Sequence, residues 1–316
     1  MRALGIILAG GNSKRMKELS HKRAISAMPV AGSYRSIDFT LSNMTNSHIQ
    51  KVAVITQYNS RSLHEHLNSS KWWDFGRKQG GLYTFTPTVT PDNSNWYRGT
   101  AESIYQNILF LKRSHEPYVV IANGDCVYKM DYNKVLEYHI AKKADITVVV
   151  KDMPADAEIE RYGTVKMNED FRIEEFEEKP MVVKSTTVSC GIYVIRRRQL
   201  IELLEKCAEE GRYDFVQDIL IRYKDVKRIY GYKINSYSFP FTFCFSPPTY
   251  VVVFHRIPSY IIRPRYIVHI ILSLQFYKHR RRLVGAFLRT TTSILHCQAI
   301  SVSHILDIYV AISIRQ

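Results

Sequence analysis

The sequence lacks any apolar run long enough to cross a bilayer, which takes about 20 residues in a helix. It also lacks the marks of a secretory leader, because the apolar run after Arg2 is short and Gly10, Gly11 and Asn12 follow it in place of a cleavage site. The five cysteines are odd in number, widely spread and never spaced C-x-x-C, which argues against a disulfide framework and a zinc cluster. These absences predict a cytoplasmic protein without a membrane anchor.

Acidic residues are scarce in one part of the chain. The formal net charge is +15, and residues 238–316 contain nine lysines and arginines but a single acid, Asp307. The rest of the chain holds 35 basic and 28 acidic residues, so this larger part is only mildly basic. A mild excess of positive charge suits an enzyme that handles polyphosphates.

The first sixteen residues have the pattern of a phosphate-binding loop. A short apolar run, Leu4–Ala9, is typical of a buried strand and breaks at Gly10 and Gly11 into a polar stretch that contains Lys14 and Arg15. Glycines let the backbone approach a ligand, and the N–H groups of such a turn, with cations beyond it, suit phosphate. An ordinary strand-to-helix loop with solvated basic residues has the same composition, so both interpretations stay open here.

Strands and helices alternate through the larger part of the sequence. Apolar runs rich in β-branched residues predict strands at 51–56, 118–122, 146–150, 188–195 and 229–234. Apolar residues at helical spacing predict helices at 100–111, 131–140 and 200–207, with Thr100 and Asp131 as the N-caps of the first two. This alternation indicates an α/β domain with a largely parallel sheet.

Residues 71–98 contain all three tryptophans and show neither a helical nor a strand period, which predicts a long loop. The aromatic side chains would either stack on a nucleotide base or form a small apolar cluster.

Polar residues follow the predicted strands at the ends where α/β sheets bind ligands. Asp125 comes shortly after the strand 118–122, and a lone carboxylate there can hold Mg²⁺ together with substrate phosphates. Alternatively, Asn123-Gly124-Asp125 is only a turn. Gly191 interrupts the strand 188–195, which predicts that something comes close at that point.

A set of short motifs occurs in a fixed order through the first 237 residues. These motifs are Leu8–Gly11 with Arg15, Lys22–Ala24, Arg35–Phe39 with Leu41–Asn43, Ile55–Tyr58, Trp96–Ala101, Gly124–Asp125 with Tyr128–Tyr132, Glu178–Pro180 and Gly191–Val194. In order and spacing they resemble the catalytic domain of bacterial glucose-1-phosphate adenylyltransferases. The resemblance implies a Rossmann-like nucleotidyltransferase domain with a mostly parallel mixed sheet, and the reaction of ATP with glucose 1-phosphate to give ADP-glucose and pyrophosphate.

The resemblance also implies site residues. Mg²⁺ and cations would neutralise charge on the departing phosphates. The residues expected at the triphosphate and nucleotide are Gly10, Gly11, Arg15, Gly99 and Thr100; at the metal, Asp125; and at the sugar phosphate, Gly163, Lys179 and Ser189. Arg15, Asp125 and Lys179 would be the catalytic residues.

Three departures from the family pattern indicate weak turnover. The opening loop has Ser13 where catalytic members carry a glycine, Ile25 replaces a lysine, and Val216-Gln217 replaces Gly-Lys. Removing a cation that faces a developing phosphate charge costs on the order of a hundredfold in rate. The pattern resembles the regulatory, GlgD-type subunit, which implies a hetero-oligomer with a catalytic-type subunit. A fully active sugar-nucleotide pyrophosphorylase of this or another specificity is the alternative, although the Trp96–Ala101 motif favours ADP-glucose.

Residues 238–316 do not continue the family pattern, in which a left-handed β-helix of hexapeptide repeats follows. They show no hexapeptide period and contain one glycine, Gly285. Such an abrupt change is typical of an out-of-frame reading, so we hypothesise a frameshift near residue 238 and leave this tail unassigned. Lys278–Arg282 as a nucleic-acid or membrane patch, and 266–276 as a buried element, are weaker alternatives. We therefore expect neither a nucleic-acid nor a membrane partner.

Overall fold

The computed structural model describes residues 2–11, 20–30, 34–68, 73–76, 80–88, 96–154, 157–234 and 243–244. The strands of the main sheet are β1 (Ala3–Ala9), β4 (Lys51–Thr56), β5 (Gly81–Phe85), β6 (Tyr118–Asn123), β8 (Ile146–Asp152), β9 (Gly163–Met167), β10 (Ile173–Glu178), β11 (Thr187–Arg196) and β12 (Ile229–Lys233). Two short pairs are separate from it: β2 (Pro29–Val30) with β3 (Tyr34–Arg35), and β7 (Cys126–Val127) with β13 (Phe243–Cys244).

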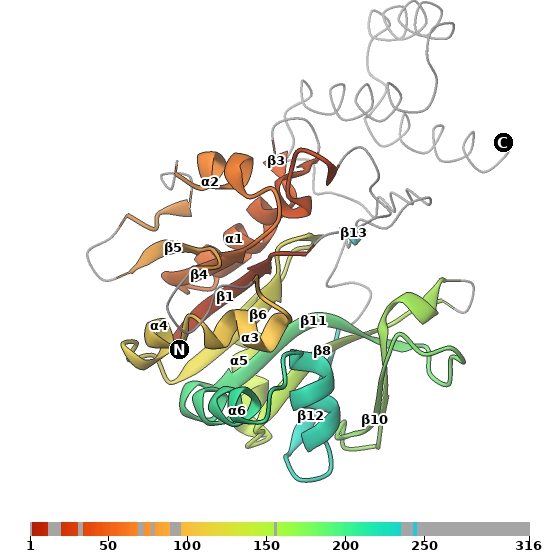
Figure 1. Cartoon of the computed structure of the whole chain (residues 1–316). Coiled ribbons are helices and arrows are strands. Elements are labelled where there is room, and N and C mark those ends of the chain that lie inside the picture. Colours follow the sequence, from red (N-terminus) through yellow and green to blue (C-terminus); the bar gives the residue numbers. More distant parts are fainter. Residues whose placement is uncertain are drawn as a thin grey trace, which may run out of the picture. The chain divides into compact units, whose positions relative to one another are not determined.

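The main sheet is mixed, and four consecutive parallel strands, β6, β1, β4 and β5, extend to one end of it. Its order is β10-β9-β11-β6-β1-β4-β5, and β8 pairs with both β11 and β12 (Figure 1). β5, β4, β1 and β6 run parallel to one another, and β8 runs parallel to β12, whereas β11 is antiparallel to both β6 and β8. The predicted α/β domain with a mostly parallel sheet is confirmed.

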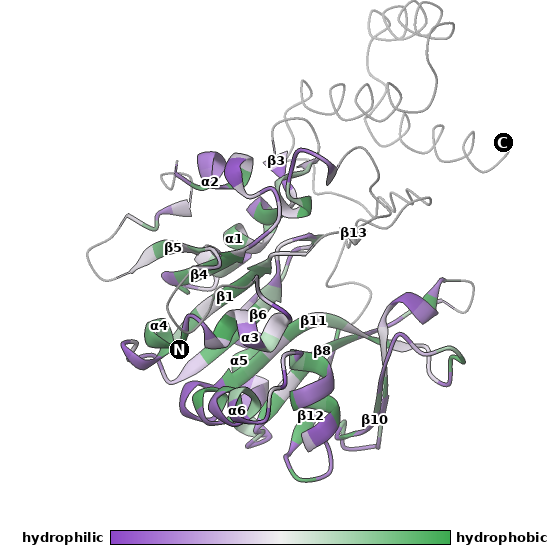
Figure 2. Cartoon of the chain, viewed as in Figure 1, coloured by the Kyte–Doolittle hydropathy of each residue, from purple (hydrophilic) through white to green (hydrophobic). Residues whose placement is uncertain are grey.

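Helices cover both faces of this sheet. They are α1 (Ser36–Asn46), α2 (Arg61–Leu67), α3 (Thr100–Tyr105), α4 (Ile108–Lys112), α5 (Tyr132–Ala141) and α6 (Arg197–Glu209), with 3-10 turns at Ile25–Ala27 and Ile159–Arg161 and a π-helix at Val216–Ile221. One hydrophobic cluster joins α1, α2 and α5 to one face, and the other joins α3, α4 and α6 to the opposite face. Among the described residues, the central strands are correspondingly rich in hydrophobic side chains (Figure 2).

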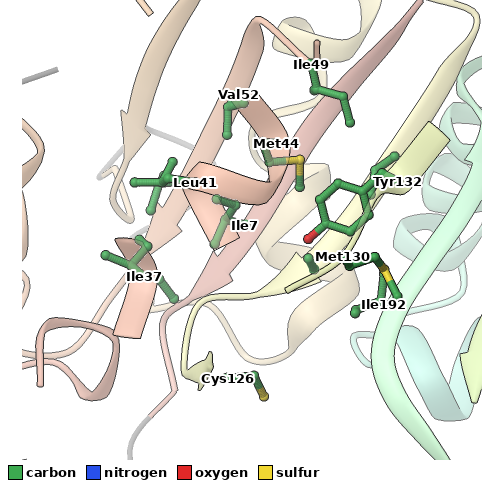
Figure 3. Packing of buried hydrophobic residues seen from close by; sticks show 14 of the residues in the cluster. Ile7, Ile37, Leu41, Met44, Ile49, Val52, Cys126, Met130, Tyr132 and Ile192 are labelled. Atoms are coloured by element: carbon green, nitrogen blue, oxygen red, sulfur yellow. The ribbon is translucent and has the colours of Figure 1, made fainter. Parts of the chain in front are cut away.

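Strand alternation explains why two cores form. Successive side chains of a strand point to opposite faces. Ile7 of β1 therefore packs in the cluster of α1, where it lies near Leu41 and Met44 (Figure 3), whereas Ile6 packs in the cluster of α3. Every residue of β1 except Leu8 is buried, so the opening apolar run forms the middle of both cores.

The predicted loop at 71–98 is wrong in part. Residues 81–85 form β5, which pairs with β4 in parallel and lies at the end of the sheet order. Its five residues, Gly-Leu-Tyr-Thr-Phe, are too few to show a clear alternation of apolar and polar side chains. Tyrosine, threonine and phenylalanine nevertheless favour a β-strand. Trp73 is buried in the core with α1, and Trp72 lies outside the described residues.

The predicted helix at 100–111 also differs from the structure. Gly99, not Thr100, is the N-cap of α3, because the Thr100 hydroxyl accepts a hydrogen bond from the Phe215 N–H (2.9 Å) and does not cap its own helix. The helix is divided into α3 and α4 near Asn107, whose side-chain amide donates to the Ser103 carbonyl at 2.9 Å. Asp131, by contrast, caps α5 as predicted, accepting from the Asn133 N–H at 3.0 Å.

Within the described ranges, none of the helices combines the length and the apolarity that a bilayer span requires.

Among the described histidines, His139 on α5 has the one shifted pKa. It is 1% exposed, its Nδ1 lies 2.8 Å from Thr147 Oγ1, and its ring meets Tyr118 edge-on. Its Nε2 is buried without a hydrogen-bond partner. Burial, and then the positive charge of Arg196, lower the pKa of His139 from 6.5 to about 4.

The free energy of unfolding should therefore fall as the pH drops from about 6.5 towards 4, because the unfolded chain binds a proton that the folded chain excludes. A shift of this size is worth about 3 kcal/mol. Urea titrations at pH 7 and pH 4.5 measure it: His139→Gln should flatten the difference between the two pH values, whereas the exposed control His115→Gln should keep it. Equal pH dependence in the unaltered chain and His139→Gln would contradict this assignment.

Candidate functional site

The carboxyl ends of β1 and β6 bring the glycine turn next to Asp125. The two strands pair in parallel up to Leu8 and Asn123, and the Gly124 N–H then donates to the Leu8 carbonyl at 3.0 Å. A Cβ at Gly124 would lie 3.0 Å from Ser26 Oγ, so the 3-10 turn at Ile25–Ala27 packs over the same point. Parallel strands end at one edge of a sheet, and this edge is where α/β folds bind ligands.

Gly10 and Gly11 occupy this edge in different ways. Neither has a backbone in the left-handed region. A Cβ at Gly10 would come within 3.3 Å of Gln57 Cβ, at the end of β4, whereas a Cβ at Gly11 would meet nothing within 4 Å. Limited space, and not an unusual φ angle, therefore explains the glycine at position 10. The predicted site residue Arg15 and the substituted Ser13 lie outside the described residues.

The carboxyl group of Asp125 is the candidate metal ligand at this edge of the sheet. It is half-buried, and none of the ion pairs within the described ranges includes it. Burial raises the pKa of Asp125, and hydrogen bonds from its own N–H and from the Cys126 thiol (3.6 Å) lower it in part. No group of three or more metal-ligating side chains occurs in the described part. A metal here would take its other ligands from substrate phosphates and water, as Mg²⁺ commonly does.

The predicted sugar-phosphate residues come together at β9, β10 and β11. Val188 of β11 pairs with Thr164 of β9, which places Ser189 beside Gly163. A Cβ at Gly163 would lie 2.8 Å from Glu178 Oε2, so glycine makes room for this carboxylate. Lys179 follows with its N–H bonded to the Tyr162 carbonyl (3.2 Å) and its Nζ 3.5 Å from Glu178 Oε1.

Gly191 connects this group to the end of β6. Its φ of +68° lies in the left-handed region, and a Cβ there would collide with the side-chain amide of Asn123. The close approach predicted at Gly191 is confirmed, and its partner is Asn123. The Gly191 N–H donates to Ser189 Oγ at 3.3 Å, which orients that hydroxyl on the strand.

The predicted nucleotide residues Gly99 and Thr100 pack against the segment before the π-helix. A Cβ at Gly99 would collide with the Tyr213 carbonyl, which accepts from the Ala101 N–H at 2.8 Å. The Thr100 hydroxyl lies 3.4 Å from Asp214 Oδ2. The side chain of Thr100 is therefore occupied inside the fold, and any contact with a nucleotide falls to the backbone around Gly99.

Sequence reasoning missed two acids and a tyrosine that the structure adds to this edge. Burial raises the pKa of Glu178 and Lys179 lowers it, while the negative charge of Asp214 raises it further, so the two acids lie within electrostatic range. Burial likewise raises the pKa of Tyr193, which hydrogen-bonds Ser189. Glu178 and Tyr193 lie inside motifs that match the family pattern, and Asp214 comes just before Val216-Gln217, where the sequence departs from it. Membership of these motifs could have pointed to the three residues.

Trp96 and Tyr58 form a stacked pair beside the site. Their rings are 5.5 Å apart and inclined by 13°, and Trp96 is 58% exposed. The adjacent Tyr97 N–H donates to Gln57 Oε1 at 2.9 Å, which ties the pair to the end of β4 near Gly10.

Comparison with known proteins follows the same residues. Residues 4–236 match the model of the family described as nucleotidyl transferase. The chain is 41% identical over 238 residues to a glucose-1-phosphate adenylyltransferase of Clostridium novyi (strain NT), covering 75% of this chain and 61% of that protein. It is 40% identical over 239 residues to a protein of the same name from Bacillus anthracis, covering 75% and 63%. The chain thus spans about three fifths of the length of these relatives.

Gly99→Ala should destabilise the protein by about 1–3 kcal/mol, the usual cost of overpacking, because the methyl group meets backbone that cannot rotate away. The contact between α3 and Tyr213 should open as a result. Gly76→Ala is the matched control, since a Cβ at Gly76 meets nothing within 4 Å. Urea unfolding midpoints measure both variants, and equal midpoints would show that the approach of Tyr213 to Gly99 is not tight.

Proposed function

The chain belongs to the nucleotidyl transferase family, and from this premise we propose that it is a glucose-1-phosphate adenylyltransferase subunit of glycogen biosynthesis, acting in the cytoplasm on ATP and glucose 1-phosphate. One observation carries the proposal. Segments far apart in the sequence, at Gly10, Asp125, Lys179 and Ser189, meet at one edge of the sheet. The names and 40–41% identity of the relatives support the choice of substrates.

In this proposal the two sides of the site bind different substrates. Gly10 and Gly11, with Arg15, line the triphosphate of ATP, and the backbone at Gly99 and Thr100 borders the nucleotide. Lys179 offers its ammonium to the sugar phosphate, while Ser189, and Gly163 by leaving space, border the sugar. The reaction is an in-line attack of the sugar phosphate on the α-phosphorus, in which positioning and charge neutralisation supply most of the rate.

Asp125 is the proposed metal-holding residue. Its carboxylate forms no ion pair with another described residue and follows β6 beside the β1 turn, which fits Mg²⁺, an ion usually held by one or two carboxylates together with substrate phosphates. When bound, Mg²⁺ supplies positive charge for the departing pyrophosphate. Asp125 itself contributes a negative charge that holds the metal next to the turn at Gly10 and Gly11.

We propose that this subunit turns over weakly by itself and modulates a catalytic-type partner. Ile25, where catalytic members have lysine, is 6% exposed, so an apolar side chain fills that place. Gln217 is exposed, and its N–H donates to Asp214 Oδ1 at 2.8 Å. Both positions thus lack a cation near the acids of the site.

Steady-state assays of the purified chain should detect little ADP-glucose. Gln217→Lys should raise turnover with little change in stability, because its side chain is exposed, and Ile25→Lys should raise it further at a cost in stability. Together the two changes should recover on the order of tenfold to a hundredfold in rate, by analogy with single-donor removals elsewhere. The exposed control Lys143→Gln, which lies before β8 at the opposite end of the strand, should leave the rate unchanged. Fast ADP-glucose synthesis by the unaltered chain would instead support the alternative, a fully active enzyme.

Co-expression with a catalytic-type adenylyltransferase subunit tests the proposed partnership. Co-purification of the two chains, with a changed response to activators, is the expected result. A catalytic subunit that purifies and responds as it does alone would contradict a regulatory role.

We also propose a domain boundary at residue 237, with residues 1–237 as the nucleotidyltransferase domain and 238–316 as an out-of-frame tail. The family match ends at residue 236, which supports this boundary. Of the tail, only Phe243–Cys244 is described, as a short strand beside Cys126–Val127. Resequencing the gene around codon 238 decides between the two origins of the tail, and an intact reading frame would refute the frameshift.

A further inference from the structure

Helix α1 carries a buried polar stripe that the substrate assignments do not use. Ser36, Thr40 and Asn43 of α1, and Ser47 at its C-cap, follow one another at intervals of four, three and four residues, which puts them on one side of the helix. All four are at most 4% exposed. Polar side chains in such positions are costly unless each finds a hydrogen-bond partner.

The partners of the stripe are backbone groups on both flanks of Asp125. Before it, Thr40 Oγ1 donates to the Asn123 carbonyl at 3.1 Å. After it, Asn43 Nδ2 donates to the Tyr128 carbonyl at 2.9 Å, and Asn43 Oδ1 accepts from the Met130 N–H at 3.1 Å. Between β6 and α5 this segment has only β7 as regular structure, so its backbone groups depend on side-chain partners.

The two ends of the stripe extend this anchoring. Ser47 Oγ accepts from the Tyr132 N–H at 2.9 Å, where α5 begins. Ser36 Oγ donates to the Ile25 carbonyl at 3.3 Å, on the 3-10 turn that packs over Gly124. Apolar neighbours hold the helix in place: Leu41 and Met44 of α1 share a buried cluster with Met130 and Tyr132 (Figure 3).

We propose that Asn43, supported by Thr40, is a positioning residue for the Asp125 carboxylate and thereby for the metal–nucleotide complex. Asn43 is the one member of the stripe whose side chain bonds both a carbonyl and an N–H of the Asp125 segment. The Asn43 amide thus bonds one carbonyl and one N–H of the segment, as a neighbouring strand would. A shift of the segment along α1 would break the bonds to both Tyr128 and Met130. The inference rests on the proposed function, because it takes Asp125 as the metal-holding residue.

The experiment compares the ATP dissociation constant with Mg²⁺ and with EDTA, by calorimetry on the full chain without sugar phosphate. Asn43→Ala should reduce the strengthening of ATP binding by Mg²⁺ about tenfold or more, the usual effect of losing an outer-shell partner, and leave the EDTA value unchanged. Thr40→Val, which removes one hydroxyl, should show the same effect to a smaller extent and decides the matter if Asn43→Ala does not fold.

Thr147→Val is the control, because it also removes a buried hydroxyl bond, to His139, on a strand remote from the Asp125 segment in sequence. It should lower the unfolding midpoint and keep the Mg²⁺ effect. A Mg²⁺ effect equal to that of the unaltered chain in both Asn43→Ala and Thr40→Val would overturn the inference alone. An unaltered chain that binds no ATP under either condition would overturn the proposed function, and the inference with it.

Discussion

The parallel pairing of β1 with β4 on one side and with β6 on the other is the constraint on which the rest of the site depends. Because the three strands run in one direction, the segments that leave them, at Gly10, Gln57 and Asp125, must start from the same edge of the sheet. Hydrogen bonding between strands fixes how far each extends, and the bond from Gly124 to Leu8 continues this alignment one residue past β6. The antiparallel β11 then brings Ser189 and Gly191 to that edge from the opposite direction.

The sequence predicted the elements whose pattern is local and left out those that depend on contacts elsewhere. The buried strands and the cap at Asp131 are recognisable because apolar runs and a short polar side chain act within a few residues. The strand β5 was missed because its stability comes from β4, a partner about thirty residues away. The N-cap of α3 was predicted one residue too late, at Thr100. The Thr100 hydroxyl accepts a hydrogen bond from Phe215 instead, and this distant contact cannot be read from sequence spacing.

The candidate site shows the same division. The glycine turn indicated Gly10 as a candidate phosphate-binding residue, and the family resemblance implied Asp125 as the metal residue. The acids Glu178 and Asp214 became visible only in three dimensions, where their charges interact across 36 positions of sequence. Arg98 shows the reverse case. It is a cation near this edge, yet it is bound to Glu102 (2.9 Å) and lies 3.8 Å from the centre of the Tyr213 ring, so its charge serves the packing of α3.

The burial of Ile25 distinguishes the two positions, 25 and 217, at which the family pattern leads us to expect lysine. A mutation to lysine at position 217 adds a side chain to water and leaves the fold as it is. At position 25 the same mutation brings an ammonium group into a place that is 6% exposed, where desolvation opposes the charge. A lysine at position 25 should therefore make the protein less stable. Under the proposed function, a selection for higher turnover should therefore yield lysine at position 217 first, and at position 25 only in chains with stability to spare.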